Sequence, residues 1–196
     1  MTTRRPAAGI DLYWLPLGAG GHVVRLNGRL YEAVAARVAR RPVRALYHSA
    51  LEVRTRDGRF VIEMTPIRPG DGDDRGVVAE GPVGSALVGR FRLFRYEIRR
   101  WRDGVIPDVR EAVASPQRLS DDEAVARRLL AVVPSVPTPV WGRDELRTGE
   151  MWNSNSLVSW LIVRSGLDAD AVSFPPNGRA PGWDAGRVVA RRSRGA

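Results

Sequence analysis

The sequence feature that most constrains the fold is a pair of alternating segments separated by a turn signal. Across residues 43–54 the side chains alternate between two faces, with Tyr47 on the more apolar face and His48 on the other. An Asp-Gly pair follows at 57–58 and is a strong short-range signal for a β-hairpin. Residues 60–65 then supply the returning strand. The pattern predicts an antiparallel hairpin and, around it, a sheet-based core.

The remainder of the chain adds short strands and stretches of helical period that follow capping residues. Together they predict an α+β fold in which a small antiparallel sheet packs against helices. Arginines crowd one face of the last strand, which predicts a solvated or edge face there. The expected strands are residues 12–15, 77–83 and 90–101, and the expected helices are residues 27–40, residues 120–133, and a segment that follows 153–156 and ends before Gly166.

The length of 196 residues suits one domain, which we assign to residues 1–185. Residues 186–196 are basic and are expected to form a flexible tail. The longest apolar run, residues 129–133, is far shorter than the roughly 20 residues that cross a bilayer. We therefore expect a cytoplasmic protein without a transmembrane segment, and the sequence does not indicate an oligomeric state.

Two absences in the composition exclude several kinds of chemistry. The chain has no cysteine, which excludes disulfides, thiolate zinc sites and a cysteine nucleophile. It also has no lysine, so that a P-loop, a pyridoxal Schiff base and a Ser-Lys pair are excluded as well. We expect neither a metal nor a cofactor.

The charge has two explanations. A net charge of +9 favours a nucleic-acid partner, with Arg90, Arg92, the following arginines and the tail as its contacts. However, arginine to the exclusion of lysine, together with abundant Ala, Gly, Val and Pro, is typical of codon use in a GC-rich bacterial genome. We therefore treat a nucleic-acid partner as the weaker interpretation.

Three residues could form a nucleophilic site. Ser154 lies at the start of an expected helix, His48 lies on one hairpin strand, and Glu63 lies on the other. Serine, a base and a residue that orients the base are the groups that acyl transfer requires. Each has a plain structural alternative, because Ser154 or Asn153 can cap the helix, His48 can be a core residue and Glu63 can face solvent.

Four segments resemble the circularly permuted NlpC/P60, papain-like superfamily, which includes lecithin:retinol acyltransferase-like and PPPDE-like proteins. They are YHSALEV at 47–53, DG at 57–58, VIEMTP at 61–66 and NSNSLV at 153–158. The resemblance implies a permuted papain-like core with Ser154 at the position of the nucleophilic cysteine. It also implies that His48 is the base and Glu63 the orienting polar residue.

Substrate contacts and the hairpin register complete the hypothesis. Asn153 and Tyr47 are candidates to complete an oxyanion site, and Trp152 is a candidate to line a groove. Catalysis requires the register in which Glu63 stands opposite Ala50; a strict two-residue turn at 57–58 would place it opposite Glu52 instead.

The resulting hypothesis is a hydrolase or acyltransferase that acts on an amide, peptide or acyl bond through an acyl-serine. Its substrate would be a small molecule, a lipid or a peptide. The alternative is a pseudoenzyme that binds a peptide, a lipid or a protein, because serine replaces the family's cysteine.

Overall fold

The computed structural model describes residues 8–17, 37, 40, 42–67 and 75–193. The helix expected over residues 27–40 falls almost entirely outside the described residues, and the second histidine of the chain, His22, also lies outside them. The strands are β1 (Gly9–Pro16), β2 (Ala45–Thr55), β3 (Gly58–Pro66), β4 (Val77–Pro82), β5 (Arg95–Arg102), β6 (Gln117–Ser120) and β7 (Gly178–Arg179). The α-helices are α2 (Glu123–Val132), α3 (Ser154–Arg164) and α4 (Trp183–Arg192), and the short 3-10 helices are η1 (Val88–Arg90), η2 (Arg92–Phe94), η3 (Val109–Glu111) and η4 (Val133–Ser135).

The strands form one mainly antiparallel sheet in the order β4-β5-β3-β2-β1-β6, and β7 pairs in parallel with the start of β2. The predicted hairpin is β2–β3, with Thr55 opposite Gly58 and Leu51 opposite Ile62. Glu63 therefore follows opposite Ala50, which is the second of the two registers considered. The turn residues are consequently 56 and 57, one position earlier than an Asp-Gly turn requires.

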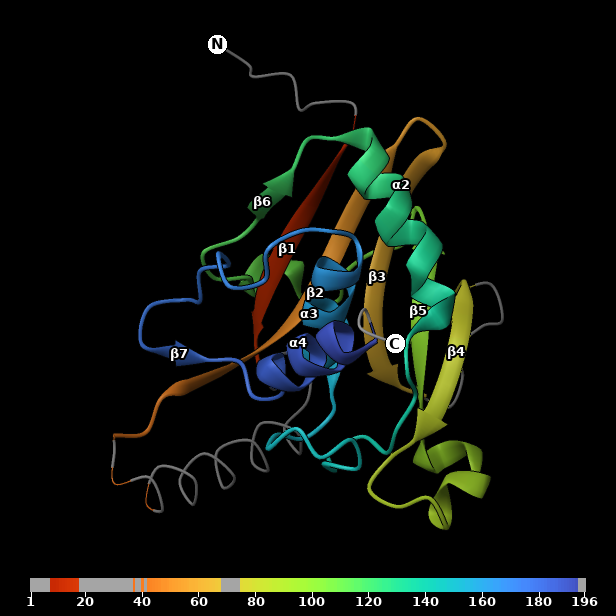
Figure 1. Cartoon of the computed structure of the whole chain (residues 1–196), viewed down its shortest axis with the longest axis vertical. Coiled ribbons are helices and arrows are strands. Elements are labelled where there is room, and N and C mark those ends of the chain that lie inside the picture. Colours follow the sequence, from red (N-terminus) through yellow and green to blue (C-terminus); the bar gives the residue numbers. More distant parts are fainter. Residues whose placement is uncertain (1–7, 18–36, 38–39, 41, 68–74, 194–196) are drawn as a thin grey trace.

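Helices α2, α3 and α4 all cover one face of the sheet (Figure 1). This helix face carries the large core, to which β1 contributes Leu12 and Trp14 and β2 contributes Leu51. The second face carries a smaller apolar cluster of Tyr13, Leu15, Ala50, Val61 and Ile106. The fold is therefore α+β, as predicted, with a sheet that is packed on both faces.

Two expectations about the arginine-rich segments were wrong. Residues 183–192 form α4 and not a flexible tail, because Val189 and Ala190 bury against the core while Arg191 and Arg192 remain exposed. The arginine stripe of β5 is not a solvated edge either. This strand lies between β3 and β4, and Arg99 is buried in ion pairs with glutamates.

Helix α2 begins later than the sequence suggested. We expected Ser120 to open it in a capping box, but the cap is Asp122, whose carboxylate accepts a hydrogen bond from the Ala124 amide at 2.7 Å. Ser120 ends β6 instead, and its hydroxyl accepts from the Asp122 amide at 3.1 Å. In the part of the chain that the structure describes, no helix is long and apolar enough to cross a membrane.

Candidate functional site

The N-terminus of α3 is closed by its own polar residues. The side-chain oxygen of Asn153 accepts hydrogen bonds from the amides of Asn155 and Ser156, at 2.9 and 3.4 Å. The Ser156 hydroxyl accepts from the Asn153 amide at 3.0 Å, which completes a capping box. Helix-terminal amides of this kind could stabilise an oxyanion, but these two already have a partner.

Polar side chains of α3 also hold the segment that leads into α4. Three of them donate to consecutive backbone carbonyls at residues 181–183. Asn155 reaches the first carbonyl at 2.9 Å, Ser156 the second at 2.7 Å and Ser159 the third at 2.7 Å. The first turns of α3 are therefore buried and tied to the start of α4.

Ser49 is the β2 residue that meets this end of α3. Its hydroxyl donates to the side-chain oxygen of Asn155 at 2.8 Å, and the Asn155 amide donates to the Tyr47 carbonyl at 2.9 Å. Both Ser49 and Asn155 are buried. A hydroxyl and a carboxamide do not take up a proton near neutral pH, so the pair joins strand to helix without providing a base.

His48 points to the opposite face of the sheet, because side chains alternate along a strand and Ser49 faces the helix. The imidazole is half-buried, and burial lowers the pKa of His48 to about 4, although the negative charge of Asp108 partly opposes this shift. Asp108 immediately precedes η3, on the segment that also carries the second-face residue Ile106. His48 is therefore neutral at pH 7 and lies on the side of the sheet away from α3.

Glu63 shares the second face with His48, but its carboxylate pairs with Arg99 at 2.9 Å. Arg99 also forms an ion pair with Glu97, and Arg75 donates two hydrogen bonds of 3.0 Å to the Glu97 carboxylate. Burial alone would raise the pKa of Glu97, but the hydrogen bonds from Arg75 and Arg99 outweigh it and hold that pKa below its ordinary value. Among the described residues, Glu63 thus belongs to a buried ion-pair cluster with Arg75, Glu97 and Arg99.

The structure does not bring together the three residues matched to a catalytic site. Ser154 lies in the first turn of α3 on the helix face, whereas His48 and Glu63 lie on the second face. Among the described residues, no hydrogen bond joins Ser154 to His48. Ser154 and His48 therefore lie on opposite faces of β2.

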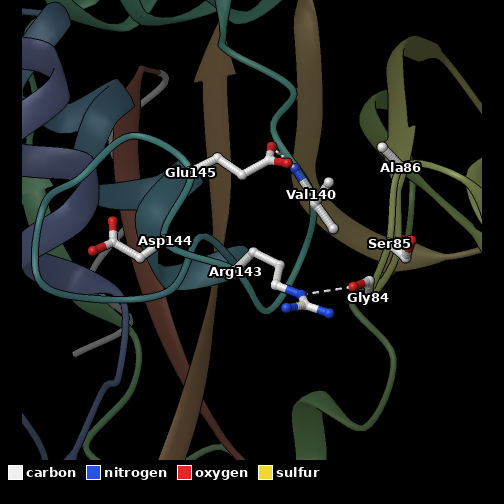
Figure 2. A pocket seen from close by; sticks show the side chains of 7 residues that line it. All are labelled: Gly84, Ser85, Ala86, Val140, Arg143, Asp144 and Glu145. Atoms are coloured by element: carbon white, nitrogen blue, oxygen red, sulfur yellow. Dashed lines mark hydrogen bonds between the residues drawn. The ribbon is translucent and has the colours of Figure 1, made fainter.

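The three residues predicted to contact substrate contribute to the packing and capping of the fold. Asn153 caps α3, and it is one of the two residues, Asn153 and Ser154, that the sequence allowed as this cap. Tyr47 is buried, and its ring lies against Gly178 so closely that a β-carbon there would approach it to 2.6 Å. Trp152 is also buried in the large core. None of the three is among the residues that line the cleft shown in Figure 2.

Ser49 and Asn155 are the residues that sequence reasoning missed at this junction. The alternation of β2 contained a signal for Ser49, because it has the same parity as Tyr47 and Leu51 on the more apolar face. No comparable local signal marks Asn155, since every residue of its motif is a good helix cap.

A shallow cleft lies elsewhere, between the loop after β4 and the connection from η4 to α3. Its volume is about 440 Å³, and Figure 2 shows the seven residues that line it. The Arg143 guanidinium donates to the Gly84 carbonyl at 2.7 Å across the cleft, while Glu145 accepts from the Val140 amide at 2.8 Å. Arg143 therefore joins the two loops, whereas Glu145 bonds within the connection that carries it.

The arginines of β5 do not form a continuous cationic face. Arg95 pairs with Glu80 at 2.9 Å, Arg99 is buried, and Arg100 donates to the Leu130 carbonyl at 3.1 Å. In contrast, Arg90 and Arg92 are exposed next to the strand. The described residues contain no group of three or more acidic, histidine or cysteine side chains that could hold a metal ion.

Comparison with protein families, curated proteins and solved structures finds no match to this chain.

Proposed function

We propose that the chain is a noncatalytic relative of the permuted papain-like proteins and acts as a binding module. The observation that carries this proposal is the buried hydrogen bond between Ser49 and Asn155, where β2 meets the N-terminus of α3. In the proteins that the sequence resembles, the base comes from the hairpin and the nucleophile from this helix end. Here the two groups that meet provide neither an acid nor a base.

The order and packing of the elements support the relationship. The β2–β3 hairpin precedes α3 in the chain, α3 starts against one strand of this hairpin, and the helices cover one face of a mainly antiparallel sheet. This is the arrangement that the resemblance implies. This agreement in layout supports the proposed relationship.

Three requirements of acyl transfer oppose a mechanism through Ser154. A serine nucleophile needs a base within hydrogen-bonding distance, but His48 lies beyond the sheet. An oxyanion needs unoccupied donors, but two of the helix amides bond to Asn153. A substrate needs open space, but Ser154 is only 5% exposed. Binding is therefore favoured over hydrolysis or acyl transfer.

Single-cysteine variants test the noncatalytic assignment. Because the chain has no cysteine, Ser154→Cys introduces its only thiol, and Ser135→Cys in η4 provides an exposed control. We expect alkylation by iodoacetamide at pH 7 to be at least about tenfold slower for the thiol at position 154 than for the thiol at position 135. The pH dependence at position 154 should follow a thiol pKa at or above the ordinary value of about 8.5, because burial raises a thiol pKa and His48, the histidine that the structure describes, lies on the other face of β2.

The opposite outcome is equally clear. A thiol at position 154 that reacts faster than the control and titrates below pH 7 would reveal an assembled nucleophile site, and the noncatalytic proposal would be refuted. Circular dichroism of both variants ensures that the comparison concerns folded protein.

A further inference from the structure

A cluster of exposed apolar side chains lies in the connection between β4 and β5. We call residues 84–94 the apolar tip. The exposed fractions of its large side chains are high for leucine and phenylalanine. They are 84% for Leu87, 52% for Phe91, 66% for Leu93 and 43% for Phe94.

The apolar tip is an ordered structure. It contains η1 and η2, and the Gly89 amide donates to the Ser85 carbonyl at 3.1 Å. Arg95 at its end donates to the Gly89 carbonyl at 3.0 Å and also pairs with Glu80. The backbone therefore holds these side chains outward in a defined arrangement, and Figure 1 shows the two short helices beyond the ends of β4 and β5.

The charge of the apolar tip has a single sign. Arg90 and Arg92 are exposed between the apolar residues, and the Arg90 guanidinium lies 4.8 Å from the centre of the Phe91 ring. No acidic residue occurs in the sequence between Glu80 and Glu97. Apolar side chains flanked by arginines are the pattern that enters the boundary of an anionic bilayer, with arginines at the phosphates and apolar groups below them.

We propose that the apolar tip docks this protein onto anionic membrane surfaces, with Leu87, Phe91 and Leu93 inserted below the headgroups and Arg90 and Arg92 at the lipid phosphates. The projecting shape fits a fluid interface, which needs no complementary pocket. The inference rests on the proposed binding role and specifies its partner. Either can fail alone, because vesicle binding does not depend on the reactivity of a thiol at position 154.

Binding of the full-length chain to vesicles tests the proposal. The vesicles contain phosphatidylcholine with about 30% phosphatidylglycerol, and pure phosphatidylcholine is the comparison. Wild-type protein should bind the anionic vesicles, and added salt should weaken that binding. The double variant Leu87→Ser/Leu93→Ser should bind at least about tenfold more weakly, because burial of apolar surface drives insertion.

The arginines have a separate test. Each cation near an anionic surface contributes roughly fivefold to binding, so Arg90→Gln/Arg92→Gln should weaken it about 25-fold. The control Arg56→Gln/Arg110→Gln removes the same charge from exposed positions outside the apolar tip. Val105→Ser removes an apolar side chain, 61% exposed, beyond the other end of β5. Both controls should keep most of the binding.

Several results would overturn the proposal. The first is wild-type protein that does not bind anionic vesicles. The second is a loss of vesicle binding in the control variants that is as large as the loss in the variants of the apolar tip. A third is self-association abolished by Leu87→Ser/Leu93→Ser without vesicle binding, which would make a second copy the partner. A fourth is binding to DNA that the arginine variant weakens, together with vesicle binding that neither variant of the apolar tip changes.

Discussion

Removal of Asn155 should destabilise the protein by an amount that its hydrogen bonds set. The Asn155 side chain accepts from Ser49 at 2.8 Å and donates to the carbonyls of Tyr47 and Pro181, each at 2.9 Å. A typical intramolecular hydrogen bond contributes about 1 kcal/mol, so Asn155→Ala should lower the free energy of unfolding by about 3 kcal/mol. Ser49→Ala removes one of these bonds and should cost about 1 kcal/mol.

A double-mutant cycle isolates the bond between strand and helix. Once Asn155 is alanine, Ser49→Ala has no such bond to remove, so the two changes should couple by about 1 kcal/mol. Urea unfolding monitored through the six tryptophans measures all four proteins, and exposed Ser135→Ala serves as a control with a change below about 0.5 kcal/mol. Strict additivity, with Ser49→Ala as mild as the control, would refute the assignment of this pair as a structural junction.

Three further predictions concern packing and pH. A β-carbon at Gly186 would lie 2.0 Å from the Ser156 carbonyl oxygen. Gly186→Val should therefore lower the free energy of unfolding, measured in urea, by more than about 2 kcal/mol. An unchanged unfolding midpoint would contradict the close contact between α3 and α4. Because the pKa of His48 falls to about 4 on folding, the unfolded chain takes up a proton at this residue before the folded protein does, so the free energy of unfolding falls as pH drops from 6.5 toward 4. His48→Gln should therefore flatten the pH dependence of unfolding between these values by at most about 3 kcal/mol, and an unchanged slope would rule out this desolvation. The lowered pKa of Glu97 implies that its ionised carboxylate stabilises the fold above the ordinary glutamate pKa and that this stabilisation is lost as pH falls below that value. The loss of stability caused by Glu97→Gln at pH 7 should therefore shrink below about pH 4. A loss that stays constant with pH would contradict the ion-pair assignment.

The hairpin could be predicted because its signals are local. Alternation over residues 43–54 and the nearby turn signal identify two neighbouring strands, and the two possible registers follow from the turn. The helix that ends before Gly166 was also predictable, from apolar periodicity and a capping motif. In both cases neighbouring residues along the chain supply the deciding interactions.

Helix α4 was missed because its stability depends on distant contacts. Its buried side includes small residues such as Ala185, Gly186 and Ala190, which give little apolar pattern among the arginines. Gly186 allows close approach to the backbone of α3. Such packing is a property of the folded protein, and the local sequence alone suggested a frayed tail.

The distance between the candidate site residues in the fold was hard to predict for a related reason. Alternation separates His48 from Ser49, but it does not reveal which face of the sheet the helices will cover. Matching by residue type favoured the histidine, whereas Leu51 and Val53 direct the Ser49 face into the large core. The buried partner of Glu63, Arg99, is 36 residues away and could not be identified from the strand alone.

The most direct test of the proposal that this junction is noncatalytic is the pKa of His48, measured by NMR in the wild-type protein and in Ser154→Cys. The chain has only one other histidine, so assignment needs a single His22→Gln variant. We predict that His48 titrates near pH 4 in both proteins, and that Asp108→Asn lowers its pKa further because Asp108 raises it. A pKa near 7 that changes when position 154 becomes a thiol would mean that the two side chains interact, and it would contradict the separation of His48 from α3.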